Sequence, residues 1–424
     1  MILDSHLRVM SVVGTRPEAI KMAPVIKALQ AHPNMNSVLC LTAQHREMLD
    51  QVLEIFAIKA DFDLDLMQPS QTLNGLSSRI FQSIDELLAS AQPDVVLVHG
   101  DTTTAFVTSV ACFHRNIPVG HVEAGLRTYD LLRPFPEEMN RRIVDLVATY
   151  LFAPTERARH NLLAEGIMSD EIHVTGNTIV DSLRFMIAKI DDDPELQLRL
   201  AERFPALPSG RKLVLVTGHR RESFGPGFER ICQALRRIAE RGDVELVYPV
   251  HLNPNVAKPV NKILGRARRV HLIPPTDYMT FVHLLSRAAV VITDSGGVQE
   301  EAVSLGKRVL VMRELTERPE GIEAGLAHLV GTDPNLICSK FEEIMEVSDE
   351  TSPEGNQSVY GDGNAASRIV AALAKSQGLP NRSAPERTKS NVDVLAELAT
   401  TAMRRAEEQA WQSGDLSSEF TEIA

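Results

Sequence analysis

Three acidic side chains follow apolar runs in the first part of the chain, and their type suggests proton transfer. Asp101 stands in H-G-D-T-T-T, Glu123 in G-H-V-E-A-G and Glu137 in P-F-P-E-E. Because parallel strands end at one edge of a sheet, we expect the three carboxylates to gather there. Carboxylates held together with little water raise one another's pKa, as general acid–base catalysis requires. The pattern predicts a kind of chemistry and no particular substrate.

Two of the three acidic residues also have a purely structural interpretation. Asp101 can cap the helix expected after it, as can the Thr102–Thr104 run. Glu137 and Glu138 suit the positive end of a helix dipole. The convergence of three carboxylates on one sheet edge favours catalysis over these alternatives.

The segment V-V-G-T-R-P-E-A-I-K, residues 12–21, has the form of a strand that turns directly into a helix. Such a turn at Gly14 is predicted to leave free backbone N–H groups at the sheet edge, where anions bind. Glu18 suits the helix dipole, and Arg16 and Lys21 add cations nearby. The spacing is not G-x-G-x-x-G, so no dinucleotide is indicated. An ordinary turn with a surface arginine is the alternative.

The second part of the chain repeats this design in V-T-G-H-R-R-E-S-F-G, residues 216–225. A strand and a glycine turn are followed by His219, Arg220 and Arg221. This places backbone donors and cations together, which suits a pyrophosphate.

A further turn, T-D-S-G-G-V-Q-E-E-A, combines Ser295, Gly296 and Gly297 at a predicted helix N-terminus, where an anion can bind. Glu301, a turn into the helix, could accept hydrogen bonds from a ribose diol. A lone S-G-G turn is more often only structural. Two such turns followed by an acidic residue favour a nucleotide site.

The elements that must position these residues alternate regularly. Short apolar runs, typical of parallel strands buried on both faces, alternate with helical stretches. In the first part we expect strands at 7–13, 36–42, 94–99 and 117–122, and helices at 18–30, 45–56 and 104–113. In the second part we expect strands at 212–217, 245–250, 270–273, 290–293 and 308–312. This rhythm predicts an α/β protein with doubly wound parallel sheets.

The rhythm pauses between residues 191 and 211, where a charged helix and a Pro/Gly loop are expected. We therefore expect two Rossmann-like domains, 1–178 with the catalytic carboxylates and 179–360 with the nucleotide site. Residues 361–376 form an expected C-terminal helix that packs back on the first domain. Residues 377–424 comprise a polar linker and a terminal helix at 392–411. A solvated helix, an oligomer contact and a regulatory tail are open interpretations of this segment.

The composition excludes several function classes. A formal net charge of −12 over 424 residues argues against nucleic acid or an anionic membrane as partner. The four cysteines lie far apart and the histidines lack metal-ligand spacing, so neither disulfides nor a metal site is expected. The opening segment is too short in its apolar run for a signal peptide, and no run reaches the ~18 apolar residues of a membrane span. We expect a cytoplasmic protein.

Taken together, these motifs resemble the non-hydrolysing UDP-N-acetylglucosamine 2-epimerases. The likeness extends from about residue 7 to residue 375 and rests on these blocks, in this order: GTRPEAIKMAP, TAQHREMLDQVL, PDVVLVHGDTTT, PVGHVEAGLRT, PFPEE, TGN, TGHRRESFG, YPVHLNPNV, TDSGGVQEEA, LGK and MRELTERPE. It implies two Rossmann-like domains in the GT-B arrangement, with the active site between them, and a homodimer as the usual assembly.

The resemblance also implies an activity, the reversible epimerisation at C2 of UDP-GlcNAc to UDP-ManNAc without a cofactor, which feeds cell-surface polysaccharide synthesis. UDP leaves by anti elimination through 2-acetamidoglucal and adds back after C2 is reprotonated from the other face. Carried over by motif, Asp101, Glu123 and Glu137 are the catalytic acids and bases, with His219 beside the phosphates. Asp101, Glu123 and His219 would also contact the nucleotide-sugar, together with Arg16, Lys21, Thr276, Phe281, Ser295, Gly296, Gly297, Glu301 and Arg318. Phe281 would lie against the uracil.

Two departures from the family pattern bear on the substrate site. Thr276 stands where close relatives often have Gln near the uracil. Arg133 replaces a small residue just before the P-F-P-E-E segment that contains Glu137.

A third departure concerns regulation, since some members bind a second UDP-GlcNAc as an allosteric activator. Gln44, Arg220 and His251 match the pattern of that site, whereas Glu47 and Ser70 differ from it. The resemblance thus leaves allosteric activation open.

Rival functions also remain open. A GT-B glycosyltransferase would use the same cleft and donor but would exchange no proton at C2. A catalytically silent nucleotide-sugar sensor would bind its ligand without turnover. Such a sensor would be expected to lack at least one of the three carboxylates, but all three are present. A hydrolysing relative would release free ManNAc and UDP.

Overall fold

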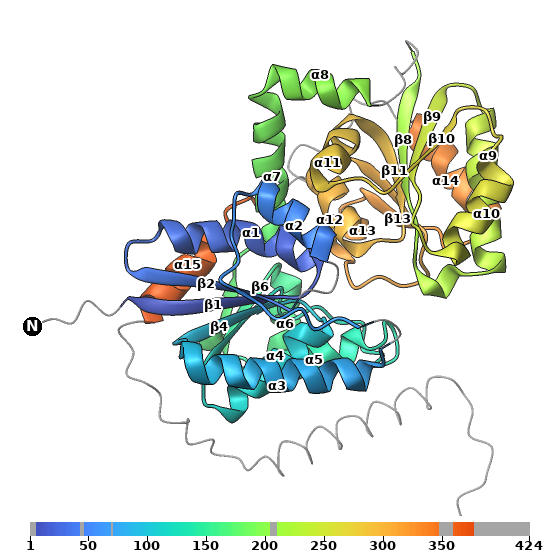
Figure 1. The fold of residues 1–424 in the computed structure, drawn as a ribbon. Coiled ribbons are helices and arrows are strands. Elements are labelled where there is room, and N and C mark those ends of the chain that lie inside the picture. Colours follow the sequence, from blue (N-terminus) through green and yellow to red (C-terminus); the bar gives the residue numbers. More distant parts are fainter. Residues whose placement is uncertain (1–5, 43–45, 69–70, 204–209, 347–358, 377–424) are drawn as a thin grey trace, which may run out of the picture. The chain divides into compact units, whose positions relative to one another are not determined.

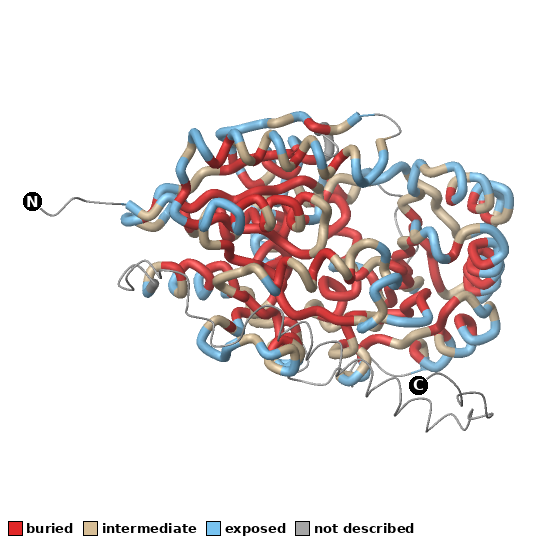
Figure 2. Tube along the Cα trace, turned by 90° about the horizontal axis from the view of Figure 1, so that it is seen from below, coloured by how far each residue is buried: buried red, intermediate tan, exposed pale blue. Residues whose placement is uncertain are grey.

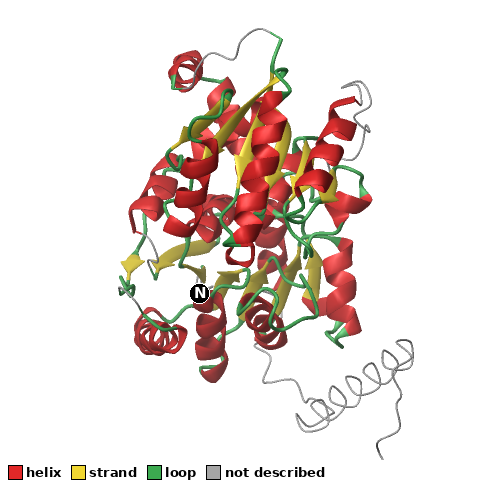
Figure 3. Ribbon diagram, turned by 90° about the vertical axis from the view of Figure 1, so that its right-hand side faces the viewer, coloured by secondary structure: helices red, strands yellow, loops and turns green. Residues whose placement is uncertain are grey.

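The computed structural model describes residues 6–42, 46–68, 71–203, 210–346 and 359–376. These residues form two parallel sheets with helices on both faces of each (Figure 1; Figure 3). No helix among them combines the length and apolar character that crossing a bilayer requires.

The first sheet has seven strands in the order β3-β2-β1-β4-β5-β6-β7, all paired in parallel. Its strands are β1 (Leu7–Val13), β2 (Met35–Leu41), β3 (Phe62–Asp63), β4 (Val95–His99), β5 (Val119–Val122), β6 (Tyr150–Ala153) and β7 (Ile172–Val174). The chain changes direction across the sheet between β1 and β4. Ligands of open α/β sheets bind at such a switch point, beyond the carboxyl ends of the strands.

Helices cover both faces of this sheet and bury the apolar strand residues between them (Figure 2). On one face pack α3, α4 and α5, and on the other α1, α2, α7 and α15 (Figure 1). The helices are α1 (Arg16–Ala31), α2 (Arg46–Ile55), α3 (Leu73–Ala91), α4 (Thr103–His114), α5 (Glu137–Val147), α6 (Glu156–Ala164), η1 (Ser169–Glu171) and α7 (Thr178–Asp191).

The second sheet has six parallel strands in the order β10-β9-β8-β11-β12-β13. They are β8 (Lys212–Thr217), β9 (Val244–Pro249), β10 (Val270–Ile273), β11 (Ala288–Thr293), β12 (Arg308–Val311) and β13 (Ala327–Leu329). Counted from its own first strand, this order repeats that of the first sheet. Its switch point therefore lies between β8 and β11.

The remaining helices follow α7 in the chain, and all of them except α15 flank the second sheet or connect the halves. They are α8 (Pro194–Glu202), η2 (Arg221–Ser223), α9 (Pro226–Glu240), α10 (Pro254–Leu264), α11 (Tyr278–Arg287), α12 (Gly296–Ser304), α13 (Glu320–Glu323), α14 (Pro334–Glu346) and α15 (Ala365–Ser376). Helices α9, α10 and α14 share a core with one face of the sheet. Helix α7 contacts α1 of the first half and both α11 and α12 of the second.

Helix α15 begins against the first half. The carboxylate of Asp181 in α7 accepts hydrogen bonds from the backbone N–H groups of Ala365 (3.2 Å) and Ala366 (2.9 Å). Arg368 donates to the carbonyl of Thr175 at 3.0 Å. An acidic side chain from α7 thus caps α15 at its positive end.

Most predicted elements are confirmed, and β1, β8 and β10 have the predicted bounds. The short strands β3, β6, β7 and β13 were not predicted. The predicted terminal helix at 392–411 lies outside the described residues.

Candidate active site

The three predicted carboxylates lie at the carboxyl edge of the first sheet. Asp101 follows β4, Glu123 follows β5 directly, and Glu137 is the first residue of α5. They are near enough for the charge of Asp101 to raise the pKa of both glutamates, alongside larger influences on each. The structure therefore brings together the residues that the sequence placed on separate strand ends.

Asp101 does not cap the helix that follows it. Its carboxylate pairs with Arg141 of α5 at 2.5 Å, and the side chain of Asn140 donates to its backbone carbonyl at 2.8 Å. The cap of α4 is Thr102, whose hydroxyl accepts from the N–H of Ala105. Asp101 is therefore held by a buried cation, while its own side chain is still partly exposed.

Glu123 lies in a buried ring of donors. Lys21 of α1 pairs with its Oε1, and Arg318 lies 3.8 Å from the same oxygen. Asn177 donates to it at 3.3 Å. Burial alone would raise the pKa of Glu123, but Lys21 and Arg318 outweigh burial and hold that pKa below its usual range. The expected upward shift was wrong for Glu123, because two cations distant in sequence surround it.

His99, the last residue of β4, faces the other oxygen of this carboxylate. Its Nε2 lies 3.5 Å from Oε2 of Glu123 and has no hydrogen-bond partner among the described residues. Burial, with the positive charge of Lys21, holds the pKa of His99 well below its usual range. The imidazole is therefore neutral at physiological pH.

Glu137 behaves as the carboxylate pattern predicted. Burial, with the negative charge of Asp101, raises its pKa above the usual range. The charge of Arg220 in the second half acts in the opposite direction on the same group. Its neighbour Glu138 is structural, because its two oxygens accept from the N–H groups of Thr128 and Tyr129.

The turn between β1 and α1 differs from the prediction. The carboxylate of Glu18 accepts from the N–H groups of Gly14 (3.0 Å) and Thr15 (2.6 Å), and Thr15 caps α1 in return. Thr102 donates to the second oxygen of Glu18 at 2.7 Å. Burial raises the pKa of Glu18 to about 7. The expectation of free N–H groups at Gly14 was wrong, since a capping box occupies them.

The two predicted cations of this turn both reach the second half. Arg16 donates to the backbone carbonyl of Thr276 at 3.0 Å. Lys21 pairs with Glu300 of α12 at 2.8 Å as well as with Glu123. Each cation thus connects the edges of the two sheets, which sequence spacing did not indicate.

The turn from β11 to α12 has the predicted form. No side chain of the described residues caps α12 at Ser295, so its first N–H groups remain available. A Cβ on Gly296 would lie 2.5 Å from the guanidinium of Arg318, whereas one on Gly297 would meet no described atom within 4 Å. Gly296 is needed because Arg318 crosses directly over the turn.

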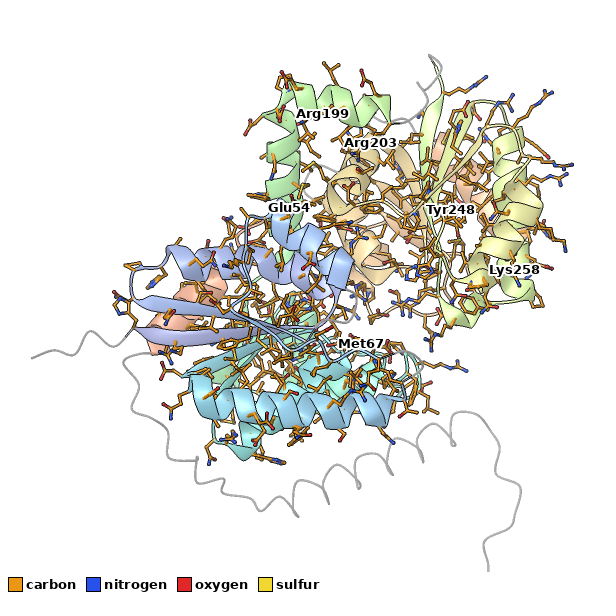
Figure 4. The ribbon with its side chains drawn as sticks, in the orientation of Figure 1. Glu54, Met67, Arg199, Arg203, Tyr248 and Lys258 are labelled. Carbon is orange, nitrogen blue, oxygen red and sulfur yellow. The ribbon has the colours of Figure 1, made fainter. Side chains whose placement is uncertain are left out.

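The His219 loop is held by an aspartate that the sequence analysis did not single out. Asp294 is fully buried, and its Oδ2 accepts from the N–H groups of His219 (2.7 Å) and Arg220 (2.8 Å). Tyr248 lies among the elements of the second sheet and donates to the carbonyl of Gly218 at 3.0 Å (Figure 4). These contacts fix the backbone on which His219 stands.

The side chain of His219 stacks on that of His251, with ring centroids 5.5 Å apart. Burial lowers the pKa of His219, although the charge of Asp294 opposes this. Of the three residues predicted for an allosteric site, Arg220 and His251 thus lie beside His219. Gln44 lies outside the described residues.

The remaining predicted contacts lie on or near α11 and α12. Glu301 is buried, and burial raises its pKa to about 7. Phe281 is buried in the core between α11 and the second sheet. Thr276 precedes α11 and meets Arg16 through its carbonyl.

Six residues of the site were not predicted individually, although their motifs were recognised. Each acts on a predicted residue through an ion pair or hydrogen bond: His99, Arg141, Asn177, Asp294, Glu300 and Glu317. The signal was their position inside the H-G-D, T-G-N, T-D-S-G-G, Q-E-E and L-T-E-R segments or, for Arg141, four residues after Glu137. Their partners could not be read from spacing.

Known proteins resemble this chain over most of its length. A family model described as UDP-N-acetylglucosamine 2-epimerase matches residues 27–374. The chain is 53% identical over 369 residues to the UDP-N-acetylglucosamine 2-epimerase of Salmonella typhimurium, covering 87% of this chain and 98% of that protein. It is 52% identical over 369 residues to the enzyme of the same name from Escherichia coli K12, with the same coverage.

Among solved structures, the UDP-GlcNAc 2-epimerase from Neisseria meningitidis, bound to UDP-GlcNAc, is 47% identical with a TM-score of 0.84. The match covers 87% of this chain and all of that one. It confirms the predicted fold class, two Rossmann-like α/β halves in a GT-B-like arrangement. The sequence identity, the family model and the architecture agree, and the chain belongs to the UDP-N-acetylglucosamine 2-epimerases, a family of isomerases.

Proposed function

We propose that this chain interconverts UDP-GlcNAc and UDP-ManNAc by inverting C2 of the sugar through loss and re-addition of UDP. The observation that carries the proposal is a pairing of two sheet edges. A cluster of three carboxylates ends the first sheet, and the uncapped N-terminus of α12, crossed by Arg318, ends the second. One edge offers proton transfer and the other offers stabilisation of a leaving pyrophosphate.

The chemistry balances without an external oxidant or reductant. A base removes the proton from C2 as the bond between C1 and the UDP oxygen breaks, giving 2-acetamidoglucal and UDP. An acid then delivers a proton to the opposite face of C2, and the UDP oxygen re-forms the bond to C1. The two proton transfers occur on opposite faces, so they call for more than one acid–base group.

The electrostatics support a division of this work among the carboxylates. Glu123 is held ionised by Lys21 and Arg318, which suits a base, whereas the raised pKa of Glu137 suits an acid. Asp101, whose charge acts on both glutamates, completes the proposed acid–base set. His99 supplies a neutral imidazole beside Glu123.

The second half supplies the proposed nucleotide contacts. The N–H groups of Gly296 and Gly297 and the hydroxyl of Ser295, together with His219, would bind the pyrophosphate, while the N–H of Ser295 itself donates to Thr293. Glu301 and Phe281 would contact the ribose and the uracil. Arg16 would complete this site from the first half, because it already meets Thr276 across the cleft.

The decisive experiment is incubation of the protein with UDP-GlcNAc in D2O, followed by NMR of the sugar. We expect deuterium at C2 and the appearance of UDP-ManNAc. Product without deuterium, or no product at all, would overturn the proposal. A glycosyltransferase would leave C2 protonated, a sensor would bind without turnover, and a hydrolysing enzyme would release free ManNAc. We further propose a homodimer and a role in supplying ManNAc for surface polysaccharides.

A further inference from the structure

A buried group of four charges joins the two halves at Glu123. Two of its members, Lys21 and Glu123, belong to the first half, and Glu300 and Arg318 belong to the second. Every side chain of the group is at most 10% exposed. Two cations and two carboxylates balance, so the group carries no net charge when all four are ionised.

Glu300 makes the closest contacts that tie this group together. One of its oxygens lies 2.8 Å from Nζ of Lys21, and the other accepts from Nε of Arg318 at 2.5 Å. Lys21 and Arg318 in turn both face Oε1 of Glu123. Glu300 does not itself contact Glu123, so it acts on that carboxylate only through the two cations.

The far side of Arg318 is also fixed. Its Nη1 pairs with Glu317, which accepts from Arg313 at 2.9 Å. Arg313 continues to Glu222 at 3.1 Å, in the short helix that follows the His219 loop. Arg318 is therefore held between Glu317 and Glu300, and its free edge points to Glu123.

We infer that Glu300 is a positioning residue, which holds Lys21 and Arg318 in place against Glu123 and thereby makes the acid–base carboxylate of one half depend on the other half. This inference rests on the proposed function, because it assigns a role to the geometry around Glu123. Without Glu300, Lys21 and Arg318 would keep Glu123 as the carboxylate that they share and would draw it out of position.

Glu300 also sets the net charge of the buried group. When Glu123 takes up a proton, the buried group is left with one excess positive charge. That charge appears in the same cleft where the departing UDP gains negative charge, and opposite charges in a dry site stabilise each other strongly. Glu300 limits the excess to one charge, since without it two cations would face a neutral Glu123.

The test is Glu300→Gln, which keeps the size of the side chain and removes its charge. We expect kcat to fall about 30-fold, since small misplacements of catalytic groups cost up to about 100-fold, and UDP affinity to fall less than kcat because the α12 turn itself is kept. The acid limb of the kcat–pH profile should move to lower pH, because Glu123 would face two cations without a competing carboxylate. A merely structural role would not move that limb.

The charged and titratable groups around Glu123 come from several elements. They are Lys21 of α1, His99 of β4, Asp101 of the loop after β4, Glu300 of α12 and Arg318 before α13. Only Glu300 changes in the variant, and the other four are kept. The direction of the shift is therefore set by loss of one negative charge near Lys21 and Arg318.

A matched control is Glu240→Gln, the same change at an exposed residue that pairs with Arg236 at 3.3 Å. An exposed pair contributes little, so its kcat and pH profile should equal those of wild type. If Glu300→Gln does not fold, Glu300→Asp decides, since it keeps the charge but shortens the reach. It should lower kcat about tenfold with the acid limb unmoved, as expected of misplaced groups.

The outcomes separate the inference from the proposed function. Wild-type protein that places no deuterium at C2 would overturn the proposed function. If wild type exchanges and a folded Glu300→Gln protein has wild-type kcat and pH profile, only the positioning role is overturned. Wild-type kcat in Glu300→Asp, where that variant is the one that folds, would overturn it as well.

Discussion

The two halves of the molecule share one strand order, but they differ in whether side chains cap the helices that follow their two central strands. In the first half, Thr15 with Glu18 caps α1, and Thr102 caps α4. In the second half, no side chain of the described residues caps α9 at Gly225 or α12 at Ser295. A capped helix has its first N–H groups occupied, whereas an uncapped one keeps them for an anion. A few side chains can therefore decide whether equivalent positions of one fold serve proton transfer or anion binding.

The largest effect should come from removing the acid–base function of the first half, whose central helices are capped. Glu123→Gln keeps the size of the side chain but cannot take up a proton, so kcat should fall about 10³-fold. UDP affinity, which we assign to the other half, should stay within about threefold. Turnover is measured by NMR and binding by calorimetry. Unchanged turnover in a folded variant would remove Glu123 from the mechanism, and a large loss of UDP affinity would break the division between the halves.

In the second half, whose central helices are uncapped, activity should be most sensitive to substitution of Gly296. A Cβ there would lie 2.5 Å from the guanidinium of Arg318, so Gly296→Ala must displace Arg318 or the turn. We expect kcat/KM to fall about 100-fold, with weaker UDP binding. Gly297→Ala places its Cβ where no described atom lies within 4 Å and should cost clearly less. Equal losses in the two variants would contradict this account of the turn.

A smaller effect on activity is expected at Asp294, a buried hydrogen-bond acceptor of the second half. Asp294→Asn weakens the hydrogen bonds that the His219 and Arg220 N–H groups donate. Loss of about 1.4 kcal/mol, typical of one charge-assisted bond, corresponds to about tenfold in kcat/KM. The control is Asp243→Asn, which breaks only an exposed pair with Arg241. Wild-type kinetics in Asp294→Asn would show that the loop holds its shape without this carboxylate.

The smallest effect on activity, and a distinct effect on stability, is expected at Glu18. Its pKa in the folded protein is about 7, above the ordinary 4.5. The folded state therefore binds this proton more tightly than the unfolded state. Its stabilising contribution is fully present below pH 4.5 and is lost as the pH rises through 7, by about 3 kcal/mol in all.

Glu18→Gln should remove this dependence while keeping the capping contacts. Urea unfolding of both proteins at pH 5 and pH 8.5 measures it, and the difference between the two proteins isolates Glu18 from other titrating groups. The variant should lose less stability than wild type over this range, with kcat changed by less than about threefold. Identical pH dependence in the two proteins would contradict the proposed burial of a titrating cap.

The sequence by itself determined the elements and the kinds of residue at their ends. Strands such as β1 and β8 were predicted with their observed bounds, because a strand buried on both faces is a continuous apolar run. The placement of Asp101, Glu123 and Glu137 at one edge followed from parallel pairing alone. Resemblance added the family, since the recognised blocks span both halves.

Only the tertiary structure decided which groups meet. Glu18 accepts hydrogen bonds from N–H groups that were predicted to be free. Two cations lower the pKa of Glu123, although repulsion among the carboxylates was expected to raise it. Glu300 and Lys21 are far apart in the sequence and pair because two sheets face each other. Periodicity reports the local environment of a residue. Its electrostatic partners depend on distances of a few ångströms between separate elements, which local patterns do not encode.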